Sequence, residues 1–385
     1  MAGWTRVYAP SELSRPIIAV DMLPYLQLSG PPYDQGLAQG AAWADQIAHN
    51  LELYFHRFEV ECKLSPAEAR ERGARYFQAI REQSPAYATG LEGIAASSGQ
   101  PLVDIATLNV RYEIVYHQFG QDTAPVYPGR EAPNGCTAFA LMPAHSADGH
   151  LWLGQNWDWM EGVQGALQHI IEPDGTRILA FTEAGIFGGK IGLNSHGLGL
   201  CINGLVSVGD NWAGLGKPFH LRTYEALRQK TLSQAKAVII ANPRTASGNF
   251  LLGQGGQAVD LEVSPMGIGI WEEERQLVHA NHYLAPERFG IEVPPIEWLD
   301  RSHHRAERLG LRLGEVEKPG LEDLKAALSD RDGAPYAVCR TASQEEYDLG
   351  EPYRTVASVI MNLGTQELWI SDGPPHENAY VRYQV

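Results

Sequence analysis

The chain of 385 residues has only four cysteines, and none of them belongs to a CxxC pair or to a Cys/His pair with zinc-finger spacing. Disulfide staples and a structural zinc ion are therefore not expected, which favours a reducing, cytoplasmic location. The chain also lacks any run of about 18 apolar residues, so it is not predicted to span a membrane. Its first residues are not followed by the apolar stretch of a secretory signal.

Positive charge is also scarce, since 30 Lys and Arg residues oppose 46 Asp and Glu residues and leave a net charge of −16. Such a surface repels phosphate backbones, which excludes nucleic acid as an expected partner. The chain has no GxSxG, no GxxxxGK followed by Ser or Thr, and no HExxH. These absences argue against a serine-hydrolase elbow, a nucleotide-binding P-loop and a zinc-protease helix. We therefore expect no cofactor and no metal site.

The first third of the chain has the pattern of a helical bundle. Small and apolar residues recur at three- and four-residue steps from Tyr33 to Phe58, which predicts helix there. The segment from Ser65 to Glu68 is typical of a helix start, with Ser as N-cap, Pro at N1 and Glu at N3. Gly36 and Gly40 either allow two helices to pack closely or kink the helix that contains them.

A stretch rich in proline and glycine, residues 124–135, separates these helices from a region of short strands. Helices within that later region are predicted at 220–230, 233–240, 301–311 and 321–327. Together the pattern favours an α+β fold, with helices outside a mostly antiparallel core. Strands are predicted at 136–142, 151–159, 178–182, 190–193, 199–203, 250–254, 258–263, 268–271, 278–281, 358–362 and 368–371.

Cys136 follows the turn residues Asn134 and Gly135 and begins an apolar, strand-like run. A helix N-terminus would lower the pKa of a cysteine nucleophile, but a strand cannot. If Cys136 were instead a chain terminus, its own α-amino group would supply an adjacent base. Gly135 would tolerate the strained backbone in which the thiol attacks the preceding carbonyl. The pattern supports self-cleavage between Gly135 and Cys136, and a buried structural cysteine is the alternative.

Asp158 lies between two tryptophans on the strand predicted to return beside Cys136. A buried carboxylate is costly unless it is paired or functional. Counting back from the hairpin signal at Asp148 and Gly149 places Asp158 opposite Phe139, near Cys136, but leaves its face of the sheet undecided. It either holds the new α-ammonium group and polarises the scissile peptide, or caps the following turn.

Two motifs together, Asn134–Ala138 and Gly154–Asp158, resemble the acyl-coenzyme A:6-aminopenicillanic acid acyltransferase family. These proteins are N-terminal-nucleophile hydrolases, related more distantly to bile salt hydrolases and penicillin V acylases. The similarity continues in Val278–Tyr283 and Thr355–Met361 and covers roughly residues 30 to 375. It implies a four-layer αββα sandwich, self-cleavage before the cysteine, and amide chemistry through an acyl-enzyme.

The resemblance also implies a role for each matching residue. Cys136 matches the nucleophile, and Asp158 matches the aspartate that orients the new amine. Asn281 matches the asparagine that helps to bind the oxyanion, with a turn or cap role as its alternative, and Asn203 matches a second oxyanion asparagine. Arg340 matches an arginine near the nucleophile, or else forms a surface ion pair.

The expected protein is a single αββα domain made of two segments, residues 1–135 as a released helical α chain and residues 136–385 as the nucleophile-bearing β chain. We expect a self-cleaving cysteine amidohydrolase that acts on a small N-acyl amide, with its two fragments joined as a heterodimer. An N-acyltransferase that passes the acyl group to an amine, and an uncleaved binding protein, are the alternatives. Gln155 stands where bile-acid relatives carry an arginine, which puts that substrate class in doubt. The sequence leaves the acyl half, the amine half and any homo-oligomer open.

Overall fold

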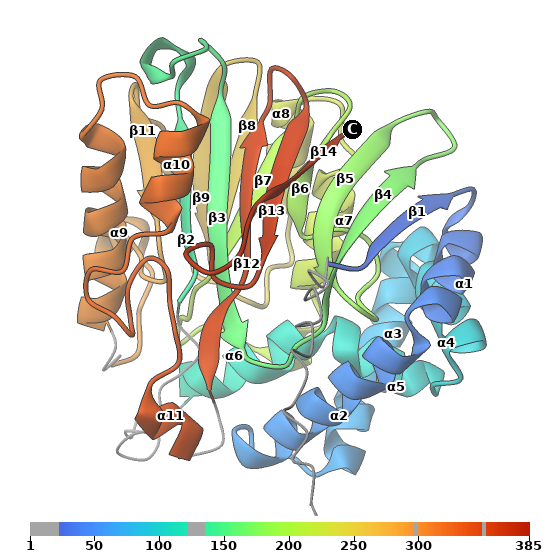
Figure 1. The fold of residues 1–385 in the computed structure, drawn as a ribbon. Coiled ribbons are helices and arrows are strands. Elements are labelled where there is room, and N and C mark those ends of the chain that lie inside the picture. Colours follow the sequence, from blue (N-terminus) through green and yellow to red (C-terminus); the bar gives the residue numbers. More distant parts are fainter. Residues whose placement is uncertain (1–22, 122–134, 296–298, 349–351) are drawn as a thin grey trace, which may run out of the picture.

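The computed structural model describes residues 23–121, 135–295, 299–348 and 352–385. Two β-sheets pack face to face, and helices cover the outer face of each, so that the layers follow the order αββα (Figure 1). This arrangement confirms the predicted α+β class and the four-layer sandwich. The proline- and glycine-rich stretch through Asn134 lies outside the described residues, and Gly135 is the first residue after it.

Fourteen strands of the described chain form the two sheets, and neighbouring strands are antiparallel except for β1 and β4. The first sheet has eight strands, in the order β1 (Tyr25–Ser29), β4 (Gly165–Ile171), β5 (Arg177–Glu183), β6 (Ile191–Asn194), β7 (Gly199–Gly204), β8 (Gly248–Gln254), β9 (Gln257–Val263) and β10 (Ile268–Trp271). The second has six, in the order β11 (Gln276–His279), β2 (Thr137–Leu141), β3 (Trp152–Met160), β12 (Tyr353–Asn362), β13 (Glu367–Asp372) and β14 (Val381–Gln384).

The helices form three groups, and the short α11 stands apart from them (Figure 1). On the outer face of the six-stranded sheet lie α9 (Leu299–Gly314) and α10 (Leu321–Leu328), and α7 (Phe219–Ala226) and α8 (Leu232–Ile240) cover the eight-stranded sheet. The short α11 (Gln344–Asp348) precedes β12. The front of the chain folds into α1 (Pro32–Ala42), α2 (Ala44–Val60), α3 (Pro66–Gln83), α4 (Pro85–Ser98), α5 (Leu102–Asn109) and α6 (Arg111–Gln121).

Single 3-10 turns occur at Pro143–His145, Trp212–Gly214 and Pro286–Phe289. No helix in the described ranges is both long enough and apolar enough to cross a bilayer.

The helical front confirms the local signals in the sequence and corrects one boundary. The helix predicted from Tyr33 to Phe58 breaks at Trp43 into α1 and α2. Ser65 caps α3, and its main-chain N–H and hydroxyl donate to Glu68 at 2.8 and 2.7 Å. A Cβ at Gly36 would lie only 2.1 Å from the carbonyl oxygen of Gly90 on α4. Glycine is therefore needed for close packing of α1 on α4, and a kink is not its role.

Every predicted strand corresponds to an observed one, but three strands were missed and one ends early. The missed strands are β1, β4 and β14. Because β11 ends at His279, Asn281 lies beyond the strand rather than in it. That position leaves the Asn281 side chain and main chain available for contacts with other elements.

The pairing of β2 with β3 differs from the expected register. Phe139 pairs with Gly154, so the expectation that Asp158 lies opposite Phe139 was wrong. The connection is asymmetric because the turn at Pro143–His145 takes up residues on the β2 side only. Since Thr137 pairs with Asn156, the next positions bring Cys136 beside Trp157 and Gly135 beside Asp158.

Candidate active site

Cys136 lies immediately before β2, and only 7% of its surface is exposed. Its thiol donates to the main-chain oxygen of Asp158, with an Sγ to O distance of 3.6 Å. Burial, together with the nearby Asp158 carboxylate, raises the pKa of the thiol to about 12. In the uncut chain the thiol is therefore protonated, as expected for a cysteine without an adjacent base.

Asp158 is also buried, and its two carboxylate oxygens have very different surroundings. Oδ1 accepts a 2.6 Å hydrogen bond from the Thr355 hydroxyl on β12, and that hydroxyl accepts from the main-chain N–H of Arg340 at 3.0 Å. Oδ2 has no hydrogen-bond partner among the residues that the structure describes. Burial raises the pKa of Asp158 to about 7, and the Thr355 hydrogen bond offsets that rise only in part.

Gly135 fills the space beside this carboxylate. A Cβ at position 135 would lie 2.4 Å from Cβ and 2.7 Å from Oδ2 of Asp158, so any larger residue would collide with the carboxylate. The main-chain N–H of Gly135 donates to Oδ1 of Asn281 at 3.2 Å, and its carbonyl accepts from the Thr137 hydroxyl at 3.5 Å. The unpaired oxygen of Asp158 thus faces the residue that precedes the cysteine.

Asn281 links this segment to the eight-stranded sheet. Its Nδ2 donates to the carbonyl oxygen of Gly204 at the end of β7, at 3.0 Å. An amide nitrogen has two N–H groups, so a second donor of Asn281 remains for another acceptor. Asn203 precedes Gly204, and its buried Nδ2 has no hydrogen-bond partner among the described residues. The structure therefore brings both predicted amides to the end of β7, close to Gly135.

Arg340 lies beside Asp158 rather than at the surface. Its side chain is 2% exposed and pairs with Glu346, so the surface ion pair considered from sequence is excluded. Through its main-chain N–H it holds the hydroxyl of Thr355, and its charge helps to lower the pKa of Asp158. Arg340 therefore touches the group that binds the carboxylate, and no described contact joins its side chain to the thiol.

Arg305 on α9 was missed by sequence reasoning. Its guanidinium donates to Oδ1 of Asn281 at 2.9 Å, and the residue is 1% exposed. Burial lowers its pKa to about 10, although the Asp158 carboxylate favours the charged form. The sequence did carry a signal for it, because Arg305 has the helical spacing of the buried face of α9, which consists of Ser302, Arg305, Leu309 and Leu313. An arginine on an otherwise inward-facing stripe indicates a partner inside the protein.

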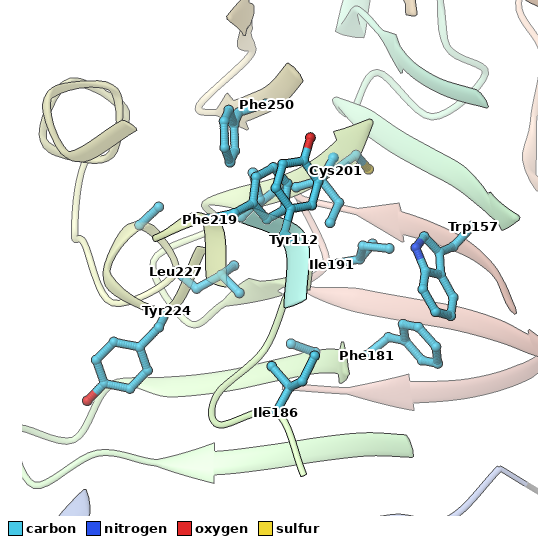
Figure 2. Packing of buried hydrophobic residues seen from close by; sticks show 14 of the residues in the cluster. Tyr112, Trp157, Phe181, Ile186, Ile191, Cys201, Phe219, Tyr224, Leu227 and Phe250 are labelled. Atoms are coloured by element: carbon cyan, nitrogen blue, oxygen red, sulfur yellow. The ribbon is translucent and has the colours of Figure 1, made fainter. Parts of the chain in front are cut away.

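A cluster of three charged side chains lies beside Trp157 of β3, and sequence reasoning missed it as well. Lys190 places its ammonium 3.2 Å from the ring centroid of Trp157 and donates to Glu183 at 2.6 Å. Arg111 on α6 also pairs with Glu183, and all three charged side chains are buried. Trp157 packs on Phe181 of the facing sheet (Figure 2), with ring centroids 5.3 Å apart. These three groups lie together in the space between the sheets, where burial lowers the pKa of Lys190 to about 7 although Glu183 favours its charged form.

Gln155, at the position where the resemblance places an arginine in bile salt hydrolases, bonds to the facing sheet. Its Oε1 accepts from the main-chain N–H of Ile202 at 2.9 Å, and its Nε2 donates to the carbonyl of the same residue. Both polar groups of the side chain are thus satisfied by β7. Gln155 therefore joins the two sheets through one hydrogen bond at each end of its amide, and it carries no charge.

The family model for acyl-coenzyme A:6-aminopenicillanic acid acyl-transferase matches residues 145–371, which include Asp158, Asn203 and Asn281 but not Cys136. A protein of Emericella nidulans described as the 40 kDa form of acyl-coenzyme A:6-aminopenicillanic-acid-acyltransferase is 27% identical over 328 residues, covering 82% of this chain and 84% of that protein.

Two solved structures are similar at low identity. An N-acylethanolamine-hydrolyzing acid amidase ortholog from Caenorhabditis elegans shares 13% identity, with a TM-score of 0.45 over 60% of this chain and 93% of that one. A penicillin V acylase from Agrobacterium tumefaciens shares 11% identity, with a TM-score of 0.38 over 62% and 83% of the two chains. Because the family model spans more than half of the sequence, the chain belongs to the acyl-coenzyme A:6-aminopenicillanic acid acyl-transferase family.

Proposed function

We propose that the chain cuts itself between Gly135 and Cys136 and then hydrolyses N-acyl amides through an acyl-enzyme on Cys136. The observation that carries this proposal is the unpaired Oδ2 of Asp158, buried against Gly135. A buried carboxylate oxygen without a donor is costly, and cleavage would create an α-ammonium group next to it. In the precursor, Asp158 thus lacks a positive partner, and the α-ammonium group of the mature protein would supply one.

Self-cleavage requires only the chain itself and water. Sγ of Cys136 attacks the carbonyl carbon of Gly135 through a five-membered ring, the C–N bond breaks, and the thiol proton passes to the released nitrogen. Water then hydrolyses the thioester, which leaves a carboxylate on Gly135 and returns the thiol. The hydroxyl of Thr137 donates to the scissile carbonyl at 3.5 Å.

The same atoms would then act on a substrate. The free α-amine of Cys136 takes the thiol proton, the thiolate attacks the amide carbonyl, and the proton moves to the leaving amine. Asn203 and Asn281 are the proposed donors to the oxyanion, because each retains an amide N–H. Water releases the acid and regenerates the thiol.

The two fragments, of 135 and 250 residues, would stay together as one αββα domain. Buried contacts cross the proposed boundary, since Arg111 and Tyr54 both bind Glu183 and the indole N–H of Trp159 donates to Tyr54 at 2.6 Å. These contacts support a heterodimer of the cleavage products. The substrate would be a small N-acyl amide, and Gln155 offers no charge for an acidic bile-acid group.

Transfer of the acyl group to an amine is the second candidate, because the Emericella nidulans relative is described as an acyltransferase. The two reactions share the acyl-enzyme and differ only in what attacks it. Competition assays distinguish them by comparing release of free acid with formation of a new amide at millimolar acceptor. We expect hydrolysis to dominate, and transfer that outpaces it would reverse this order.

Intact mass under denaturing conditions tests the cleavage. We expect two fragments, the larger beginning at Cys136, from the wild-type chain, and a single 42.3 kDa species from Cys136→Ala. Cys201→Ala is the matched control, because Cys201 is also a buried thiol but lies within β7. Processing of Cys136→Ala at residue 135 would show that the cut is not autocatalytic.

A further inference from the structure

A row of polar side chains crosses the inner face of the eight-stranded sheet. Asn203 on β7 pairs directly with Asn249 on β8, and Asp260 lies on β9 beside them. Side chains alternate along a strand, so Gly253 shares the face of Asn249. A Cβ at Gly253 would lie 2.8 Å from Leu153 of β3, which identifies this face as the one between the sheets. All three polar residues are buried, with at most 1% exposed.

Hydrogen bonds fix the orientation of each amide in the row. Nδ2 of Asn249 donates to Oδ1 of Asp260 at 2.7 Å and to Oδ1 of Asn203 at 3.3 Å. Because Oδ1 of Asp260 accepts this short hydrogen bond, Asp260 obliges Asn249 to present its nitrogen rather than its oxygen. Asn249 in turn obliges Asn203 to present its oxygen. The nitrogen of Asn203 is therefore directed away from the row, where it has no described partner.

This spare donor lies at the end of β7 that is connected to the proposed cleavage site. The carbonyl of the next residue, Gly204, accepts from Asn281, and Asn281 accepts from the main-chain N–H of Gly135. A buried amide nitrogen without an acceptor costs stability. It becomes useful only when negative charge develops beside it, as it does on an oxyanion.

We propose that Asp260, acting through Asn249, is a positioning residue that holds the amide of Asn203 with its N–H groups directed at the oxyanion. The inference rests on the proposed function and adds two residues to it, neither of which touches the substrate. Reversing the hydrogen-bond direction along the row would turn the donor of Asn203 inward. Binding of substrate would be retained, while stabilisation of the transition state would be lost.

An exchange of the two side chains separates positioning from structural support. Asn249→Asp alone places two carboxylates side by side and should lower the melting temperature. The double variant Asn249→Asp/Asp260→Asn restores a donor–acceptor pair between the two positions, so stability should recover. The carboxylate at 249 can now only accept, so Asn203 must present its nitrogen to the row. We expect kcat to fall by ~10²–10³, with KM changed less than about twofold.

The assay uses 7-amino-4-methylcoumarin amides with acyl chains of two to twelve carbons and follows the one that the wild-type enzyme cleaves fastest. Recovery of kcat together with stability in the double variant would overturn the inference, because the row would then be structural only. Asn194→Asp is the matched control, a buried amide on β6 whose Nδ2 binds two main-chain carbonyls away from the site. It should lower stability and leave kcat of the folded enzyme unchanged.

A second pair of variants covers the case in which the exchange does not fold. Asp260→Leu removes the acceptor and frees Asn249 to rotate, so kcat should fall. Asp260→Asn can still offer an oxygen to Asn249 and should regain most of that loss. Equal activity of the two would overturn the inference.

Two further variants separate this inference from the proposed function. If Asn203→Ala keeps its kcat while Cys136→Ala is inactive, the positioning role and the oxyanion role of Asn203 are wrong, and the proposed acyl-enzyme on Cys136 stands. If Cys136→Ala remains active, the proposed function fails, and the inference fails with it.

Discussion

Asp158 and Glu183 are both buried carboxylates on neighbouring parts of the same core, yet their surroundings are opposite. Glu183 is bound by Arg111, Lys190 and the hydroxyl of Tyr54. Burial alone would raise its pKa, but the two cations hold the pKa well below the usual range. Asp158 has one hydrogen bond from Thr355 and an oxygen that no described residue binds, and its pKa is raised to about 7.

The contrast is between a buried charge whose partners are complete and one with a position that the described residues leave open. A carboxylate with a full set of donors is stable where it is and has nothing left to offer. A carboxylate with an empty position stores an unfavourable interaction that a new positive group would relieve. We therefore assign Glu183 to the fold, and we propose that Asp158 serves the chemistry.

The largest expected effect comes from replacing Asp158. Asp158→Asn keeps the shape and the Thr355 contact but cannot attract the new α-ammonium group. We expect self-cleavage and turnover to slow by ~10²–10⁴, while stability of the uncut chain changes little or rises. A time course of intact mass measures it, with Asp174→Asn at an exposed turn as control. Normal maturation and turnover would make Asp158 structural and remove the contrast.

Glu183→Gln should show the reverse behaviour. The change leaves Arg111 and Lys190 buried without their counter-charge, which should cost about 3–5 kcal/mol of unfolding free energy. Measured by urea denaturation in the Cys136→Ala background, the loss is separated from any effect of cleavage. The fraction of Glu183→Gln that folds should still cut itself. A loss of stability below about 1 kcal/mol would contradict the structural role.

The two carboxylates should also make opposite contributions to the pH dependence of the free energy of unfolding. Asp158 has a folded pKa above its unfolded value of about 4, so its contribution to stability is present below about pH 4 and is lost as the pH rises through about 7. Glu183 has a depressed folded pKa, so its contribution is present above its unfolded value and is lost on strong acidification.

Denaturation of uncut Cys136→Ala between pH 3 and 8.5, with and without each substitution, resolves the two signs. Relative to its parent, the Asp158→Asn variant should gain stability as the pH rises. The Glu183→Gln variant should lose most stability at neutral and alkaline pH. If the stability difference from the parent changed with pH in the same direction for both variants, the proposed contrast between the two carboxylates would be wrong.

The smallest test removes the one donor to Asp158 that the described residues provide. Thr355→Val keeps the volume but deletes the 2.6 Å hydrogen bond, so it should cost about 1 kcal/mol and raise the pKa of Asp158 further. The matched control is Thr182→Val, which loses a 3.3 Å hydrogen bond to a main-chain carbonyl. If both variants gave the same pH dependence of cleavage, the hydrogen bond from Thr355 would not tune the carboxylate.

Local patterns in the sequence predicted much of this fold. The cap at Ser65 and the positions of β2, β3 and β7 depend on neighbouring residues, and each is confirmed. β1 was missed because its pairing with β4 joins residues more than 100 positions apart. The register of β3 was also beyond local reasoning, since the turn at Pro143–His145 sets it and not the hairpin signal.

In the candidate site, too, some residues can be recognised from the sequence and others only from the fold. Cys136 and Asp158 stand out because their residue types conflict with an apolar strand, so sequence alone singles them out. Arg305 and Lys190 do not, because their importance arises only when α9 and β6 meet the strands that hold the carboxylates. The amide orientations of Asn203 and Asn249 depend on hydrogen bonds across three strands, which no local pattern encodes.

The contacts of Glu183 have a consequence for how the protein can be made. Arg111 and Tyr54 come from the segment before the proposed cut, and Glu183 comes from the segment after it. While the chain is whole, these groups meet by an intramolecular search. After cleavage, a denatured sample contains two separate polypeptides, and recovery becomes second order in concentration. Assembly would then happen efficiently only once in the life of each molecule.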